Sequence, residues 1–345
     1  MKPESIEPTI MDAPAWAARL KSSQEGERLA VLAELLGLAR EIPDCLEHVA
    51  AGLVHDNEGE RVLAVEVLTR MGAAAVPALI TGLEESQPPA VRIAAASGLG
   101  QIGPTADSAI DRLCGCFTGD DPMLRWHAVF ALGKIGKAAV PKLRPLLESS
   151  DPQVVSAAVD ALEWIGEEAG EAVEDLQRLA GTASSPLLQL ACTSALVKIS
   201  GDTAAALPVI EVMLQDENQD TRKACLERLG KLTVKAREFV PLILGCLEDS
   251  AGAVRAAATL ALARIEEEPS RIIEALSERL ADPEGEVRAN AAMGLTRYGP
   301  AAASALPALR ALQQDTEPRL VAIANGAIER IEKVEPQGTS DTTTE

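Results

Sequence analysis

The sequence predicts an all-α fold, a right-handed α-α superhelix (α-solenoid) built from about ten two-helix repeats. Three observations support this prediction: one motif recurs along nearly the whole chain, its apolar residues have helical spacing, and aromatic residues are scarce. The 345 residues include 59 alanines but only three Trp, three Phe and one Tyr. Such a composition suits closely packed helices better than a β-sandwich, whose strands favour aromatic side chains.

The motif recurs at a nearly constant interval. Segments 86–103, 120–136 and 282–299 share an acidic or Pro-containing turn, then Val-Arg or Leu-Arg, an Ala, a Leu and a closing Gly. When the Val of Val-Arg is numbered zero, successive units start 30 to 34 residues apart, which leaves no room for a separate catalytic domain. The ten zero positions are Glu27, Glu60, Val91, Leu124, Val154, Leu188, Thr221, Val254, Val287 and Leu320.

Each unit is predicted to be a helical hairpin. Apolar residues at zero, +4, +8 and +11 lie on one face of a helix, as Val287, Ala291, Leu295 and Tyr298 illustrate. Gly at +12 is expected to end this helix in a left-handed C-cap. A further helix follows after five or eight residues and often has Pro in its first turn, as at Pro77. A lone hairpin cannot bury both of its apolar stripes, so neighbouring hairpins must stack.

The predicted solenoid extends over residues 12–333, with polar, aperiodic and disordered tails at 1–11 and 334–345. Its first unit is expected to pair helices near 13–22 and 25–39, and its last helix to end near Glu332. The first residues lack a secretory signal, and no run of 18 apolar residues is present, so we expect a cytoplasmic protein without a membrane span. Six cysteines in a chain of this length do not make a disulfide framework.

The pattern Asp-Pro-x-x-x-Val-Arg-x-x-Ala-x-x-x-Leu-x-x-Ile-Gly, followed by Ala-Val-Pro-x-Leu, resembles HEAT repeats, specifically the short bacterial phycobilisome-lyase-like type. The resemblance covers roughly residues 13–332 and implies an α-solenoid whose second helices line the concave face. Most such proteins are protein-binding scaffolds and a minority are enzymes. Arg at +1 is expected to bridge to an acid of the neighbouring unit, but Val155 and Gln189 stand at this position and should interrupt the ladder.

Three local motifs suggest a cofactor or metal, but the repeat accounts for each of them. The Gly-x-Gly-x-x-Gly of residues 98–103 closes a helix, whereas a dinucleotide-binding loop follows a strand and opens one. Residues 216–227 have the acidic spacing of an EF-hand loop, but Thr221 replaces its required Gly. The cysteines and three histidines do not complete a metal-ligand set. We therefore predict no catalytic residue, no cofactor and no metal.

The helix that carries positions zero to +11 is the second helix of its hairpin, as the helix near 25–39 is in the first unit. The binding surface is expected on the exposed face of these second helices, at +3, +6 and +10. Position +10 is basic in seven of ten units, which fits both complementation of the helix dipole and a positive ladder along a groove. Apolar residues at +6 are either anchors for a partner or packing residues, and Trp126, at +2, is expected to pack on the other flank. The candidate binding residues are His127, Phe130, Lys134, Asp160, Trp164, Lys198, Lys231, Leu260, Arg264, Met293, Arg297 and Arg330.

The leading hypothesis is a non-catalytic, monomeric scaffold that binds an acidic or amphipathic segment of another protein in the concave groove. The alternative, by family analogy alone, is a lyase- or isomerase-type subunit acting on a protein-bound tetrapyrrole, with Cys192 or Cys225 as nucleophile if either is exposed. A third class, nucleic-acid binding through the +10 bases, is disfavoured by the net charge of −20.

Overall fold

The computed structural model describes residues 13–22, 24–39, 43–55, 57–265 and 269–333. Within these ranges the chain forms helices and no strand, so the predicted all-α repeat fold is confirmed. The chain divides into two compact units, Met1–Leu179 (unit 1) and Ala180–Glu345 (unit 2). The tails predicted at 1–11 and 334–345 lie outside the described residues.

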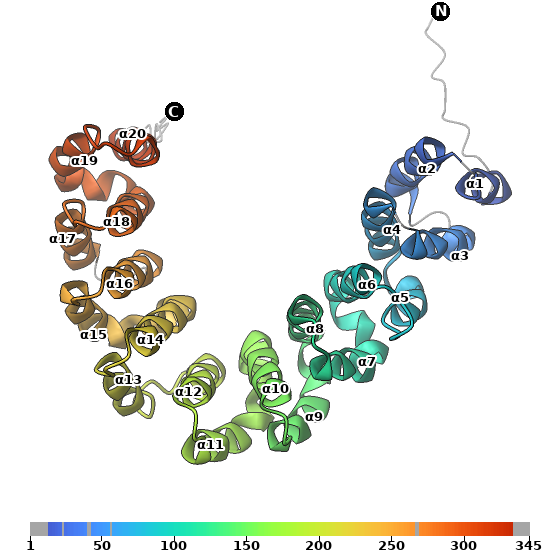
Figure 1. Cartoon of the computed structure of the whole chain (residues 1–345), viewed down its shortest axis with the longest axis horizontal. Helices are drawn as coiled ribbons and strands as arrows, with labels where there is room; N and C mark the ends of the chain where they lie inside the picture. The colour runs from blue at the N-terminus through green and yellow to red at the C-terminus, as the bar shows by residue number, and fades with distance from the viewer. Residues whose placement is uncertain (1–12, 23, 40–42, 56, 266–268, 334–345) are drawn as a thin grey trace, which may run out of the picture. The chain divides into compact units, whose positions relative to one another are not determined.

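Unit 1 consists of two layers of helices (Figure 1), and each second helix packs against the next one along the chain. The second helices are α2 (Glu25–Leu38), α4 (Glu58–Met71), α6 (Pro89–Ile102), α8 (Pro122–Ile135) and α10 (Pro152–Ile165). The first helices are α1 (Ala13–Leu20), α3 (Leu46–Ala50), α5 (Val76–Gly82), α7 (Ile110–Gly115), α9 (Val140–Leu143) and α11 (Val173–Thr182), the last of which crosses the boundary between the units.

Unit 2 has the same two-layer construction. Its second helices are α12 (Pro186–Ser200), α14 (Gln219–Leu232), α16 (Gly252–Arg264), α18 (Gly285–Tyr298) and α20 (Pro318–Glu332). Its first helices are α13 (Leu207–Leu214), α15 (Val240–Gly245), α17 (Pro269–Arg279) and α19 (Leu306–Leu312). All ten second helices of the described ranges therefore lie where the period of the sequence predicts them.

Short 3-10 helices, which the period did not predict, flank many of the first helices. In unit 1 they are η1 (Pro43–Cys45), η2 (Ala51–Val54), η3 (Gly72–Ala75), η4 (Gly103–Ala109), η5 (Cys116–Thr118), η6 (Gly136–Ala139), η7 (Arg144–Glu148) and η8 (Gly166–Ala172). In unit 2 they are η9 (Thr233–Phe239), η10 (Cys246–Glu248) and η11 (Gly299–Ala305). Most of these tighter turns carry the chain from a second helix to the next first helix, whereas η2, η5, η7 and η10 follow a first helix and lead to the next second helix.

Glycine ends several second helices, as predicted, but the cap geometry differs from the prediction. The backbone has φ 66° and ψ −137° at Gly72, and φ 81° and ψ −143° at Gly136. These angles lie outside the left-handed helical region, which only Gly201 of the capping glycines adopts, at φ 73° and ψ 4°. Because residues with a Cβ are almost excluded from φ near +70° and ψ near −140°, the requirement for Gly is stronger than a left-handed cap would impose.

One described run, Glu58–Gly82, is long and apolar enough by length and composition to cross a membrane. The run is not continuously apolar, because it contains a few charged side chains. In the structure it comprises α4, η3 and α5, and Gly72 interrupts it with a non-helical backbone. Val67, Leu68 and Leu79 of this run are fully buried in unit 1.

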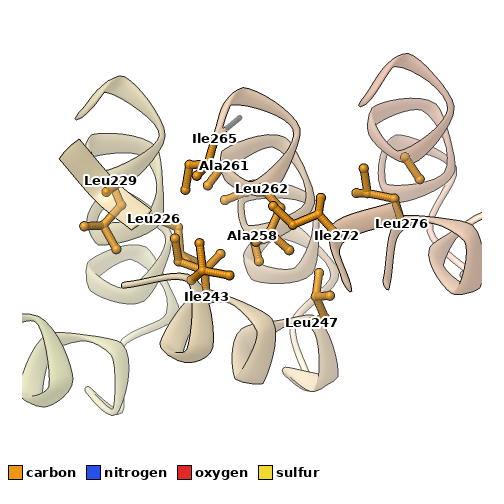
Figure 2. Close-up of a cluster of buried hydrophobic side chains, with 14 of the residues drawn as sticks. Leu226, Leu229, Ile243, Leu247, Ala258, Ala261, Leu262, Ile265, Ile272 and Leu276 are labelled. Atoms are coloured by element: carbon orange, nitrogen blue, oxygen red, sulfur yellow. The ribbon is translucent and has the colours of Figure 1, made fainter. Parts of the chain in front are cut away.

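Aliphatic side chains fill the space between the two layers. In unit 2, Figure 2 shows Leu229 of α14 and Leu262 of α16 beside Ile243 of α15 and Ile272 of α17. Each of these four side chains is at most 1% exposed. Burial of such a side chain stabilises a fold by roughly 1.5–3 kcal/mol, and here the buried partners come from successive hairpins. The hairpins therefore depend on one another for their cores.

Small residues allow neighbouring second helices to approach closely. A Cβ added at Gly100 would lie 3.0 Å from the Cα of Ala131, and one at Gly133 would lie 2.5 Å from the Cβ of Trp164. Gly98 and Gly100, part of the motif that resembles a dinucleotide loop, are thus buried packing positions of α6. Their burial agrees with the prediction that this motif is a structural feature of the repeat.

Arginine at +1 joins successive turns of unit 2. Arg222 donates two hydrogen bonds to Asp249, at 2.7 and 2.8 Å, and Arg255 makes the same pair to Asp282, at 2.8 and 2.9 Å. Arg255 also donates to the carbonyl oxygen of Asp249 at 2.8 Å, so it holds its own turn and the next one together. Arg288 continues the series with an ion pair to Asp315 at 2.9 Å.

The corresponding contacts in unit 1 are less regular. Arg28 donates to Glu60, whose side chain is only 1% exposed, but Arg125 reaches the side-chain oxygen of Gln153 in place of an acid. Val155 then occupies the +1 position of α10 and has no polar group to continue the ladder. The interruption agrees with the expectation from the sequence.

Replacement of Gly133 by Ala tests the close packing of α8 against α10. We expect Gly133→Ala to lower the free energy of unfolding by about 1–3 kcal/mol, because the new methyl group overlaps Trp164. Gly37→Ala in α2 is the matched control, since nothing lies within 4 Å of its added Cβ and it should stabilise by about 0.5–1 kcal/mol. Urea denaturation followed by circular dichroism measures both, and equal stability of the two variants would contradict the packing argument.

The ladder predicts a pH-dependent contribution to stability. Burial alone would raise the pKa of Asp282, but hydrogen bonds from Arg255 and from the backbone N–H of Glu284 outweigh burial and hold it below its usual value. A depressed pKa stabilises the fold above the unfolded-state pKa of about 3.9, and this stabilisation disappears as the pH falls through the folded-state value.

We therefore expect Asp282→Asn to destabilise the protein by about 1–3 kcal/mol at pH 7 and by much less below pH ~3. Asp111→Asn, which removes a carboxylate that is 72% exposed beside Lys142, should change stability by less than about 1 kcal/mol at either pH. Denaturant titrations at the two pH values provide the measurement. An Asp282→Asn deficit of the same size at both would show that the carboxylate charge is unimportant.

Candidate functional site

Five of the predicted binding residues lie together on two neighbouring helices of unit 1. His127, Phe130 and Lys134 belong to α8, and Asp160 and Trp164 belong to α10, which packs directly against α8. The ring centroids of Phe130 and Trp164 are 5.5 Å apart, with the ring planes at 82°. This edge-to-face contact joins the two helices at their outer surface.

Trp126 is part of the same cluster, and the prediction that it packs on the other flank is wrong. Its ring lies almost parallel to that of Phe130, with centroids 5.8 Å apart and an interplanar angle of 7°. Its side chain is 53% exposed. Residues four apart on a helix are neighbours on one face, so the spacing of Trp126, Phe130 and Lys134 already contained this information.

We call Trp126, Phe130 and Trp164 the aromatic ridge. Phe130 is half-buried, because its ring fills the space left by Gly100 on α6 and contacts Trp164 on the other side. Gly133 gives the backbone of Trp164 room to approach α8. Trp164 nevertheless remains 52% exposed, as does Met123, at 55%, one turn before His127 on α8. The ridge is therefore a supported but uncovered apolar surface.

The charges around the ridge are few and mixed. The ammonium group of Lys134 lies 5.5 Å from the centroid of the Phe130 ring, within cation–π range. The ring centroids of His127 and Trp126 are 4.8 Å apart, in an edge-to-face arrangement. The Nδ1 atom of His127 is buried without a hydrogen-bond partner in the described part of the chain. Burial lowers the pKa of His127, which favours the neutral imidazole. Asp160 is half-buried on α10.

The other seven predicted residues lie in unit 2 and are distributed over all five of its second helices. Leu260 and Arg264 lie one turn apart on α16, and Met293 and Arg297 lie one turn apart on α18. Met293 is 41% exposed and Leu260 is half-buried. The remaining three are Lys198 on α12, Lys231 on α14 and Arg330 on α20. The structure therefore brings together the five residues of unit 1, spreads the seven of unit 2 over five helices, and does not define one site containing all twelve.

The bases at +10 also fit the structural explanation considered for them. Each occupies the last turn of its second helix, where it complements the negative end of the helix dipole. In unit 1, Arg70 donates to the carbonyl oxygen of Leu36 at 2.8 Å, at the end of the preceding second helix. Position +3 is more covered than the sequence suggested, since Asn290 is buried and donates to the carbonyl oxygen of Ala256 at 3.1 Å.

Comparison with known proteins identifies the repeat. The family described as HEAT repeats matches residues 46–122, 116–197 and 206–273, which together are more than half of the chain. The chain belongs to the HEAT-repeat family. No curated protein sequence matches it.

Three solved structures are similar to this HEAT-repeat protein. A Kap121p mutant is 15% identical over 92% of this chain and 41% of that chain, with a TM-score of 0.48. Importin beta in an ammonium sulfate condition is 15% identical over 92% of this chain and 45% of that chain, with a TM-score of 0.41. An engineered protein is 20% identical over 74% of this chain and 96% of that chain, with a TM-score of 0.37. The chain thus spans less than half the length of the first two proteins.

The thiols of this HEAT-repeat protein are poorly placed for chemistry. Cys192 and Cys225, the candidate nucleophiles of the enzymatic alternative, are both fully buried. Burial raises the pKa of Cys225 to about 12 and that of the half-exposed Cys114 to about 12. Cys246, also half-exposed, has its pKa raised to about 11 by burial. Because the thiolate is the reactive form, these groups are weak nucleophiles at neutral pH.

A separate apolar hollow of about 380 Å³ lies beside the first helices of unit 1. Leu53, Val54 and Pro77 line it, and among its described lining residues only Glu47 is ionisable. A single carboxylate without a second acid or base offers no general acid–base pair. In the described ranges there is also no group of three or more His, Cys, Asp or Glu side chains that could hold a metal ion.

Thiol labelling tests this assignment of the cysteines as packing residues. In the native protein at pH 8, all six cysteines should react with an aromatic disulfide reagent at least about 100-fold more slowly than free cysteine, because burial suppresses the thiolate. The same protein in guanidinium chloride should react fully and quickly. A single thiol that reacts in the native state at the rate of free cysteine would revive the possibility of thiol chemistry.

Proposed function

We propose that this HEAT-repeat protein is a non-catalytic scaffold that binds an acidic or amphipathic segment of another protein in its concave groove, on the exposed face of its second helices. The aromatic ridge of unit 1 carries the proposal. Two Trp side chains, each more than half exposed, stand on neighbouring helices with Phe130 between them. Such side chains supply large contact areas of roughly 150–250 Å² each and commonly anchor interfaces.

The surroundings of the ridge suit an amphipathic segment. Val62 of α4, at the same +2 position as Trp126, is also exposed, at 57%. The ammonium group of Lys134 lies over the ring of Phe130 and can pair with an acidic residue of the partner, while the exposed rings contact the partner's apolar side. The twelve predicted residues enter this proposal as two surfaces, the ridge with its neighbours in unit 1 and the row of bases in unit 2.

The ends of the repeat array support a single-chain scaffold. On α20, the exposed residues Ala322, Asn325 and Glu329 lie on one face of the helix and do not form a large apolar stripe. At the other end, Arg19 of α1 pairs with Glu34 of α2 at 3.0 Å. Polar terminal repeats limit stacking of further copies, so we propose a monomer.

We further assign the repeats to the phycobilisome-lyase-like type, on the Asp-Pro and Val-Arg pattern of the sequence. Free thiols suit the reducing cytoplasm, which is the location we propose. The net charge of −20 supports a protein partner over nucleic acid. No observation favours the lyase or isomerase alternative, because its candidate thiols are buried.

Substitution of both exposed tryptophans tests the proposal. Tagged wild-type protein and the Trp126→Ala, Trp164→Ala double variant are used to capture partners from the native cell, with quantitative mass spectrometry. We expect specific partners to be retained by the wild type and lost at least about tenfold in the double variant, because the anchors of the interface are gone. Limited proteolysis of the retained complex should then locate an acidic or amphipathic protected segment.

Val212→Ala is the control variant, because Val212 is 71% exposed on α13, in the first-helix layer of unit 2. All variants should keep the wild-type circular dichroism and melting temperature. Wild-type levels of capture by the double variant would reject the ridge as the anchor, as would an equal loss with Val212→Ala.

A further inference from the structure

The apolar hollow of unit 1 lies where α3 meets α5, in the layer of first helices (Figure 1). We call the contact between two successive first helices a joint. The joints of unit 1 have the same construction, because one fully buried residue marks the same position in each first helix. These marker residues are Val49 of α3, Leu79 of α5, Leu113 of α7, Leu143 of α9 and Leu176 of α11. The residues that flank them can therefore be compared from one joint to the next.

Ion pairs bridge two of the other joints. Between α7 and α9, the ammonium group of Lys142 lies 2.8 Å from a carboxylate oxygen of Asp111. Between α9 and α11, the Nε atom of Arg144 lies 2.6 Å from a carboxylate oxygen of Asp175. Long side chains of opposite charge therefore occupy these joints and neutralise each other across them.

At the joint between α3 and α5 the corresponding cation is missing. Glu47 of α3 has the position of Asp111, two residues before the buried marker of its helix. Ala78 of α5 has the position of Lys142, one residue before the marker. Within the described ranges, no basic side chain forms an ion pair with Glu47, which is exposed at the hollow. The hollow thus has a carboxylate whose equivalent elsewhere in unit 1 is paired with a lysine.

Small side chains leave the same joint open. Ala50 of α3 and Ala78 of α5 line the hollow at the positions of Arg144 and Asp175, so two methyl groups replace an ion pair of long side chains. Val54 also lines the hollow and is 56% exposed. The next three hairpins have polar residues at its position, namely Glu84, Thr118 and Glu148. Three departures from the local pattern therefore coincide at one joint and make it wider and more apolar.

We propose that this hollow binds a small organic amine, composed of one ammonium group and an apolar body the size of a phenyl ring on a short aliphatic chain. The ammonium group pairs with Glu47, as the ammonium group of Lys142 pairs with Asp111. The apolar body packs against Leu53 and Pro77. The inference goes beyond the scaffold function, because the hollow and the aromatic ridge lie on different helices.

The charge and the volume of the hollow select this class of ligand. Glu47 is the only ionisable side chain that lines it among the described residues, and the hydroxyl group of Thr81 already donates to the carbonyl oxygen of Pro77 at 3.2 Å. A cation is therefore favoured over an anion, and the net charge of −20 favours it further. The volume of about 380 Å³ lies in the range of small-molecule sites, roughly 300–1,000 Å³. The four-carbon stem of a partner's lysine would fill little of this space.

Titration of the full-length protein with 4-phenylbutylamine tests the proposal. The protein is labelled with ¹³C at the methyl groups of Ala and Val, and binding is followed by NMR. The signals of Ala50, Val54 and Ala78 should shift together, with a dissociation constant of about 1 mM or lower. The alcohol 4-phenylbutanol and the acid 4-phenylbutanoate keep the apolar body without the positive charge, and each should bind at least about fivefold more weakly.

Variants of the joint locate the binding. Glu47→Gln should reduce the affinity for 4-phenylbutylamine to that for 4-phenylbutanol, because it removes the charge and keeps the volume. Ala78→Lys should weaken binding at least about tenfold, because it introduces the cation that Lys142 supplies elsewhere and fills the space. Asp111→Asn is the matched control, since it removes the equivalent carboxylate from a filled joint and should leave binding unchanged. Circular dichroism verifies that each variant is folded, and Glu47→Gln decides the result if Ala78→Lys disturbs the fold.

Equal affinities of the wild type for 4-phenylbutylamine and 4-phenylbutanol overturn the proposed ion pair. Absence of binding, or shifts confined to methyl groups outside the hollow, overturns the site. Nα-acetyl-lysine amide tests whether a partner's lysine is the occupant. Tighter binding of this compound than of 4-phenylbutylamine overturns the assignment to a small amine and indicates a protein ligand.

Discussion

Burial of apolar surface between successive hairpins is the constraint on which the structure depends. A hairpin of two short helices has two apolar stripes and can cover them only with its neighbours. In unit 2, the side chains of Leu229 on α14, Leu262 on α16 and Leu276 on α17 share one core. The arrangement leaves uncovered the faces of both helix layers that point away from the core, as the exposed side chains of Val212 on α13 and Trp164 on α10 show.

Two classes of basic side chain have different roles in this protein. Arginines at +1 are committed to the architecture, because Arg222 and Arg255 use several donors each on the acids and carbonyl oxygens of the turns. The same contacts hold the pKa of Asp249 below its usual value, mainly through the hydrogen bond from Arg222. Bases at +10, such as Lys231 and Arg264, lie in the last turns of their helices, where they complement the negative end of the helix dipole.

The aromatic ridge shows how an exposed apolar surface can arise from the same packing rules. Gly100 and Gly133 occupy positions where small residues let neighbouring second helices approach. The ring of Phe130 packs beside Gly100, and the absence of a side chain at Gly133 lets Trp164 approach α8 closely. One side of this group of rings therefore packs on the helices, and the other side is exposed to solvent. In unit 2, the same framework carries cations with aliphatic residues, and the two units present surfaces of different chemistry.

The sequence by itself determined the repeat, its period and the helical hairpin, because a stripe of apolar residues at 3.6-residue spacing admits few other solutions. It also identified Phe130, Trp164 and the +10 bases, since their positions on the helix follow from counting. Tertiary structure decided the features that depend on contacts between helices. It placed Trp126 on the ridge, covered position +3 in unit 2, enclosed Cys192 and Cys225, and divided the candidate residues between two compact units. The physical reason is that exposure depends on how closely the next helix approaches, which is set by glycines and rings about 30 residues away in the sequence.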